Sequence, residues 1–154
     1  MIFYSVYPTA NWRNGESSHS KSGGRVVLNV GRPLEYQPGW KVLANALASH
    51  IGKEWGVMMH GTFPSWDAEY LQQMAKDAGF DGVSVTIDIG SVRFPSVEAF
   101  ISRQVATSPL AEPIGSAPQV VRDELIQEVK DELEGYTDDD GIVFPIESYV
   151  LEAY

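Results

Sequence analysis

Three apolar segments with the character of β-strands, separated by two helical stretches, set the strongest limit on how this chain can fold. The first, 25–30, is a run of branched residues bounded by glycines, which is typical of a strand buried on both faces. The second, 83–92, alternates apolar and polar residues, which predicts one face in the core and one in water. In the third, 142–151, Pro145 removes a backbone donor, which predicts a bulge or a locally unpaired edge.

About four helices are predicted between these strands. Apolar residues recur at helical spacing over 40–51 and again over 66–78, so each stretch is predicted to bury one face. Gly79 and Phe80 follow the second stretch. They have the pattern of a left-handed glycine cap with its apolar contact, which predicts where that helix ends.

The remaining helices are predicted between the second and third strands. One begins at Pro95, a residue that favours the first turn of a helix. The longest opens with the pattern of a capping box at 116–119 and closes at Gly135, in the same manner as the helix that ends at Gly79. Its apolar stripe is predicted to consist of Val121, Leu125, Val129 and Leu133.

The length and composition predict a single compact domain. The chain has 154 residues, of which 44% are hydrophobic, enough for one core and too few for two domains. Residues 23–154 are expected to form this α/β domain. Residues 1–22 are expected to hold a short strand at 2–7 and a polar linker, because an aromatic and branched run is followed by small polar residues.

Charge and cysteine content exclude several functions. The formal net charge is -10, and no cluster of Lys and Arg is present, which argues against nucleic acid as a partner and favours basic or neutral ones. Without cysteine there is no disulfide or thiolate site, as expected in the cytoplasm. No apolar run reaches the roughly 20 residues of a membrane-spanning helix, so no membrane is expected either.

Four segments together resemble class I S-adenosylmethionine-dependent methyltransferases of the small-molecule, type 11 kind. They are KSGGRVVLNVGRP at 21–33, DAGFDGVSV at 77–85, RFPSVEAF at 93–100 and GIVFPIE at 141–147. The resemblance covers the C-terminal half of that family's fold, a two-layer or three-layer, partly Rossmann-like sheet. It implies that segments 25–30, 142–151 and 83–92 lie in this order in space, as strands five, seven and six. The last strand would run antiparallel between the other two.

The sequence departs from this family in its cofactor site. The family binds S-adenosylmethionine with a glycine-rich loop after its first strand, and this sequence contains no such loop, so no cofactor-binding residue is assigned. Without the preceding strands, the 25–30 segment would expose an apolar edge, which invites pairing. The strand at 2–7, a second copy in a homodimer, or a partner chain is expected to cover it.

Trp40, Met59, His60 and Phe94 are the candidate substrate-binding residues. His60 lies in a predicted loop, 57–64, which the resemblance places over the substrate pocket, and the apolar residues suit a small apolar ligand. Core packing explains the apolar residues equally, and a surface loop histidine explains His60. No metal site is predicted, because the three histidines are scattered and Tyr136 replaces the first acid of a calcium-loop pattern at 136–147.

Three functions remain open from the sequence. The first is a methyltransferase-like domain that does not bind S-adenosylmethionine alone and acts by oligomerising or through a partner. The second is a truncated or split methyltransferase that acts on a small molecule. The third is a small-ligand binding module that uses the candidate residues.

Overall fold

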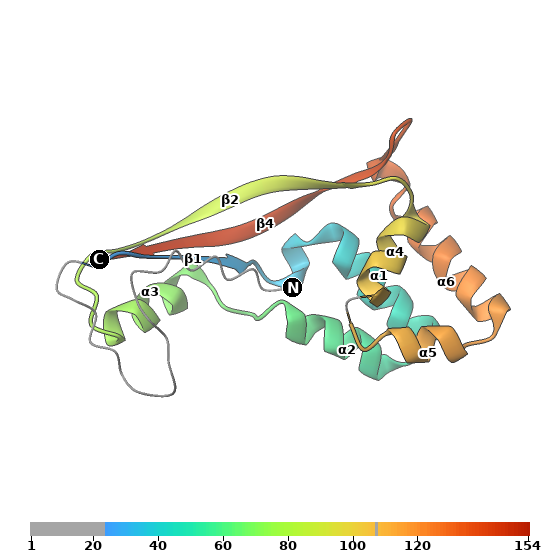
Figure 1. The fold of residues 1–154 in the computed structure, drawn as a ribbon, viewed down its shortest axis with the longest axis horizontal. Helices are drawn as coiled ribbons and strands as arrows, with labels where there is room; N and C mark the ends of the chain where they lie inside the picture. The colour runs from blue at the N-terminus through green and yellow to red at the C-terminus, as the bar shows by residue number, and fades with distance from the viewer. Residues whose placement is uncertain (1–23, 107) are drawn as a thin grey trace.

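The computed structural model describes residues 24–106 and 108–154, which form a mixed α/β fold (Figure 1). The predicted strand at 2–7 and its linker lie outside the described residues. The elements in chain order are β1 (Val26–Gly31), η1 (Leu34–Tyr36), α1 (Pro38–His50), α2 (Lys53–Thr62), α3 (Ala68–Asp77), β2 (Val83–Phe94), α4 (Val97–Ala106), α5 (Ala111–Ser116), α6 (Gln119–Glu132), η2 (Glu134–Tyr136), β3 (Thr137–Asp138) and β4 (Gly141–Ala153).

The sheet is antiparallel throughout. Its three long strands lie in the order β1–β4–β2, and β4 runs antiparallel to both neighbours. The short β3 pairs with the start of β4. This is the spatial order predicted for the three segments, whereas their correspondence to strands of a Rossmann-like sheet stays a prediction. The prediction that 25–30 is buried on both faces is wrong, because only Val30 of β1 is buried and Asn29 is exposed.

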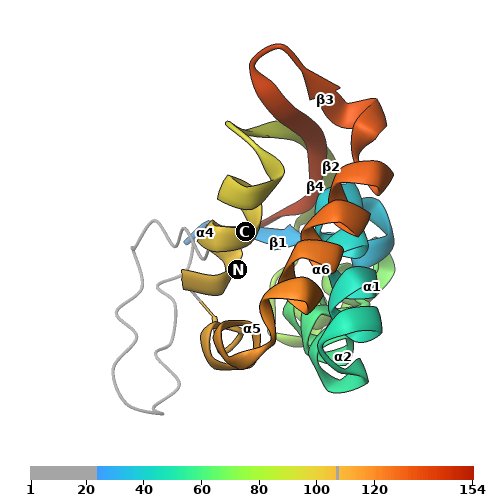
Figure 2. The same cartoon turned by 90° about the vertical axis from the view of Figure 1, so that its right-hand side faces the viewer.

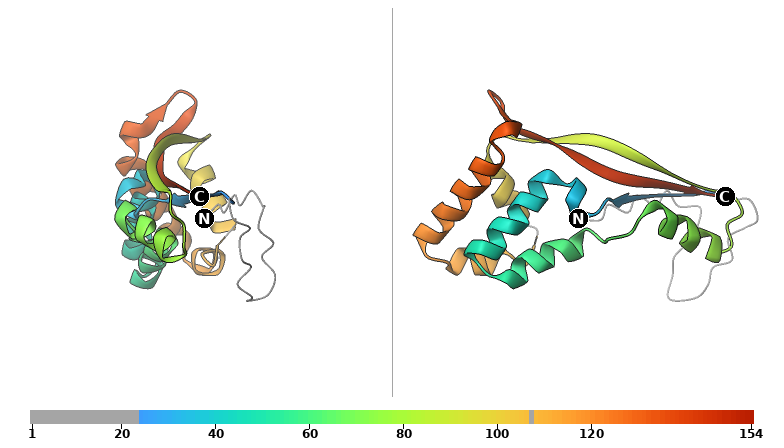
Figure 3. Two further views of the ribbon diagram at one scale, coloured as in Figure 1. Left: turned by 90° about the vertical axis from the view of Figure 1, so that its left-hand side faces the viewer. Right: turned by 180° about the vertical axis from the view of Figure 1, so that it is seen from behind.

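All six helices lie on one side of the sheet in Figure 1, so the described residues form two layers. Helix α3 lies beneath one end of the long β2–β4 ribbon, and the other helices gather beneath the opposite end. Figure 2 shows α1, α2 and α6 grouped at that end, and the rear view in Figure 3 shows α3 apart from them. The helices therefore bury two separate lengths of one ribbon.

The two hydrophobic cores use opposite faces of β4. Ile142 and Phe144 belong to the larger core, whereas Tyr149 and Leu151 belong to the smaller core, between α3 and the sheet. The β2–β4 register runs without interruption from one end to the other, so these even and odd residues point to opposite faces. Ribbons of two strands twist strongly, and this twist turns the opposite faces toward the same helical layer.

The middle of the ribbon is left open by this arrangement. The alternation in 83–92 predicts that Ile87 and Ile89 belong to the core face, but they are 52% and 66% exposed. Val83 and Val85, on the same face, do pack against the smaller core, between α3 and the sheet. The prediction fails for Ile87 and Ile89 because, among the described residues, no helix lies over the middle of the ribbon.

Pro145 lies at a locally unpaired edge, one of the two outcomes predicted for it. It stands opposite Ser91 with no bulge. The Arg32 amide donates to the Glu147 carbonyl at 3.0 Å, so odd residues of β4 direct their backbone groups toward the β1 side. Because β1 pairs only as far as Ser148, that side has no strand at Pro145 within the described chain, and no backbone donor is needed there.

Gln37 continues the sheet where β1 ends. Its side chain is fully buried, and its amide nitrogen donates to the Glu147 carbonyl at 2.6 Å and to the Arg32 carbonyl at 3.2 Å. Its amide oxygen accepts from the Glu147 backbone at 3.3 Å. A side-chain amide carries the same donor and acceptor as a peptide group, so Gln37 substitutes for one residue of a neighbouring strand.

The Arg32 side chain completes this junction. Its guanidinium pairs with the Glu147 carboxylate and lies 3.5 Å from the centre of the Tyr36 ring. Burial lowers the pKa of Arg32, but hydrogen bonds with Tyr149 and Glu147 outweigh it and raise that pKa above its usual value. The junction lies between Phe144 and Tyr149, where β4 passes from one core to the other.

Helix ends give both confirmed and wrong predictions. Gly79 has φ 92°, and the Phe80 amide donates to the Ala75 carbonyl at 3.2 Å, as the left-handed cap predicts. The prediction of a capping box at 116–119 is wrong, because Ser116 ends α5 and α6 begins after Pro118 with no side-chain cap. The prediction of a left-handed helix end at Gly135 is also wrong, since that residue belongs to a 3-10 turn.

Candidate functional site

The candidate residues Trp40 and Phe94 are packed in the larger core. The Trp40 ring lies 5.5 Å from Phe144 and 5.8 Å from Phe63, measured between ring centres, and its indole N–H donates to Gln104. Phe94 is 4% exposed and lies 5.0 Å from Phe100. Phe94 is enclosed by the core and Trp40 is half-buried against it, which agrees with the core-packing alternative.

Met59 and His60 lie on different sides of α2. The prediction of a loop at 57–64 is wrong, because α2 extends to Thr62. Met59 is 5% exposed and belongs to the larger core, whereas His60, one residue later, is exposed. Successive helical residues point about 100° apart, so these two side chains diverge. The four candidate residues are not brought around one cavity, and their binding of a substrate stays a prediction.

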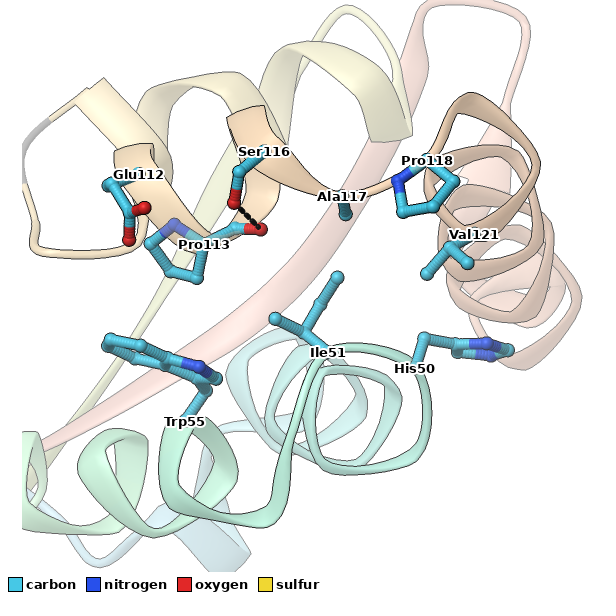
Figure 4. A pocket seen from close by; sticks show the side chains of 9 residues that line it. All are labelled: His50, Ile51, Trp55, Glu112, Pro113, Ser116, Ala117, Pro118 and Val121. Carbon is cyan, nitrogen blue, oxygen red and sulfur yellow. Dashed lines mark hydrogen bonds between the residues drawn. The ribbon is translucent and has the colours of Figure 1, made fainter.

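A cleft opens instead between two helix corners (Figure 4). One corner joins α1 to α2 at Ile51, and the other joins α5 to α6 at Ala117. Its volume is about 330 Å³, within the range of small-molecule sites. The lining residues are His50, Ile51, Trp55, Glu112, Pro113, Ser116, Ala117, Pro118 and Val121.

His50 is held at one end of the cleft by two carboxylates of α6. Its Nε2 lies 2.6 Å from Glu128 Oε2, and its Nδ1 lies 3.9 Å from Glu124 Oε2. His50 occupies the last turn of α1, where the helix dipole favours a cation. An imidazole oriented by a carboxylate can hold or move a proton.

Trp55 and Glu112 form the other end of the cleft. Figure 4 shows the Glu112 carboxylate directed toward the Trp55 ring, with Pro113 between them. Trp55 is half-buried and Glu112 is exposed. The Ser116 hydroxyl donates to the Pro113 carbonyl at 3.4 Å, so it is engaged within its own helix. An aromatic face and a carboxylate are groups that attract cations.

A second cavity, of about 320 Å³, lies between α4, α5 and α6. Most of its lining is apolar, including Ile101, Ile114 and Ile126. At its rim Lys130 donates to Glu98 at 2.5 Å, and this hydrogen bond is the main reason that the pKa of Glu98 falls to about 2.

The described residues hold no group of three His, Cys, Asp or Glu side chains that could bind a metal ion. Nor does this part of the chain contain a helix that is long and apolar enough to cross a membrane. No protein-family model matches the sequence, and a comparison with curated proteins gives no match.

The outer edge of β1 is a second candidate site. The Arg32 amide faces β4, so the even residues of β1 face β4 and the odd residues direct their N–H and C=O groups outward. The backbone groups of Val27, Asn29 and Gly31 therefore have no strand partner among the described residues, because the sheet that these form ends at β1. Such a row of groups is a template for another strand.

Proposed function

We propose that this chain is a methyltransferase-like domain that does not bind S-adenosylmethionine alone and acts as a homodimer joined at β1. The order β1–β4–β2, with β4 antiparallel to both neighbours, is the observation that supports the resemblance. The resemblance implies this order for strands five, seven and six of the methyltransferase sheet. The missing cofactor loop is the reason to expect no binding of S-adenosylmethionine by this chain.

The outward backbone groups of Val27, Asn29 and Gly31 support the assignment of the edge. Two β1 edges related by a twofold axis would pair antiparallel and form one continuous sheet across both copies. Charge does not oppose this contact. Arg25 and Arg32 lie at the ends of β1 and would approach one another across the twofold axis, but each is already paired with a carboxylate of β4, Glu152 and Glu147 respectively. Helix α6, with its row of acids, lies far from β1 (Figure 1).

Proline substitution tests the edge without disturbing the existing ladder. Asn29→Pro removes an N–H that faces outward, and proline is tolerated at strand edges. We expect the full chain to sediment as a dimer and Asn29→Pro to sediment as a monomer with an unchanged circular dichroism spectrum.

Ile87→Pro is the matched control. The Gly82 amide donates to the Tyr154 carbonyl, so the odd residues of β2 also face outward, and this proline lies on the opposite edge of the sheet. This variant should stay dimeric. A monomeric wild-type chain, or loss of the dimer by Ile87→Pro alone, would contradict pairing at β1. A monomer would favour coverage of the edge by the segment at 2–7 or by a partner chain.

Calorimetric titration tests the cofactor part of the proposal. We expect no heat of binding when S-adenosylmethionine is added to the full chain at millimolar concentration. Tight binding by the chain alone would contradict the proposal and favour an active methyltransferase. An upstream reading frame that encodes a glycine-rich loop after a strand would favour the truncated or split enzyme.

A further inference from the structure

We propose that the cleft between the α1–α2 and α5–α6 corners binds a small organic cation with a methylated ammonium group. This goes beyond the proposed function, because the cleft lies beneath the end of the ribbon opposite α3 and does not include the β1 edge.

The charges around the cleft favour a cation. Glu112 lines it, and Glu124 and Glu128 flank His50 at its other end. The lining contains no Lys or Arg. Arg122 lies near the α5–α6 corner and donates to the Ala117 carbonyl at 2.6 Å, but its side chain lines the second cavity. An anionic ligand in this cleft would face the Glu112 carboxylate, with no Lys or Arg in the lining to oppose it.

The apolar part of the lining favours an alkylated ammonium over a bare one. Pro113 lies beside the Trp55 ring, Ile51 lies in the middle of the cleft, and Val121 lies at the His50 end, so aliphatic groups line its whole length (Figure 4). A primary ammonium would lose hydration against these groups, whereas methyl groups pack against them. The face of an indole attracts a quaternary ammonium through its ring quadrupole. Trp55 and the aliphatic side chains would thus contact the methyl groups of the ammonium, and the exposed Glu112 carboxylate, on the other side of Pro113, would attract its charge.

Choline and its uncharged analogue 3,3-dimethylbutan-1-ol provide the test, because they have nearly the same shape. Each is titrated into the full-length ¹⁵N-labelled chain while the indole N–H resonance of Trp55 is followed. We expect a saturable shift with choline and binding of the alcohol weaker by about tenfold. Equal binding of both compounds, or no saturable shift with choline, would overturn the proposal.

Variants locate the site. Glu112→Gln removes an exposed carboxylate and should leave the fold intact, and it should weaken choline binding by about fivefold. Glu134→Gln is the control, because it makes the same change in net charge at an exposed residue outside the cleft. Trp55→Leu, followed through the backbone amide resonance of Ile51 in the same lining, should reduce the difference between choline and the alcohol to the part that Glu112 contributes. Equal weakening by both glutamine variants would show general attraction to an acidic protein and would overturn the site.

Discussion

Replacing Gln37 with leucine tests whether its side-chain amide stabilises the junction of β1 and β4 at Arg32 and Glu147. Leucine has a similar volume, so the substitution removes the hydrogen bonds while the space stays filled. The Arg32 carbonyl and the Glu147 N–H lose their partner, whereas the Glu147 carbonyl keeps the Arg32 amide.

The expected loss follows from these two groups. An unpaired buried donor or acceptor costs about 1–3 kcal/mol, and Glu147 is only half-buried, so we expect the free energy of unfolding to fall by about 2–4 kcal/mol. For a domain of this size, the melting temperature should fall by about 10 °C.

Guanidinium denaturation at equilibrium measures this loss, and hydrogen exchange locates it. The amide of Glu147 should exchange faster in Gln37→Leu than in the wild type. Gln127→Leu is the control, because Gln127 is exposed on α6 and its side chain donates to the exposed Asp131, so a change below about 0.5 kcal/mol is expected. A loss below about 1 kcal/mol for Gln37→Leu, with an unchanged denaturant slope, would refute the role of this amide.

Two further substitutions test local features. Gly141→Ala should lower the free energy of unfolding by more than about 2 kcal/mol, because φ is 117° and an added Cβ would lie 2.2 Å from the Phe94 carbonyl oxygen. Thermal melts measure this effect, and Gly135→Ala is the control, since an added Cβ there has nothing within 4 Å. Equal effects of the two substitutions would contradict this reasoning. The pKa of Glu98 is lowered from 4.5 to about 2, so its contribution to stability is complete above pH 4.5 and is lost as the pH falls toward 2. The free energy of unfolding at pH 7 and at pH 3 should therefore differ less in Glu98→Gln than in the wild type, by less than about 1 kcal/mol because the side chain is 46% exposed. Denaturation at the two pH values measures this, and an unchanged difference would contradict the ion pair with Lys130.

The fold was predictable where neighbouring residues decide it. The left-handed cap at Gly79 follows from a glycine and an apolar residue after a helical stretch, although the same pattern at Gly135 forms a 3-10 turn. The buried residues Leu125 and Val129 follow from helical spacing. Helix α2 was missed because its sequence, KEWGVMMHGT, contains two glycines and a weak apolar stripe. Its stability comes from packing against α1 rather than from propensity.

The cleft was beyond prediction from the sequence. His50 could be placed at a helix end, but its contact with Glu128 joins residues 78 positions apart. Trp55 and Glu112 lie in helices that periodicity did not reveal. No local pattern records that the two helix corners face each other.

The sequence by itself determined the kinds of elements, their order and the side chains suited to burial, because these depend on spacing along a few turns or a few strand residues. Tertiary structure decided which face of β4 is covered at each end. That choice depends on the twist accumulated along the whole β2–β4 ladder and on where the helices dock, so Phe144 and Tyr149 are both buried although they point to opposite faces.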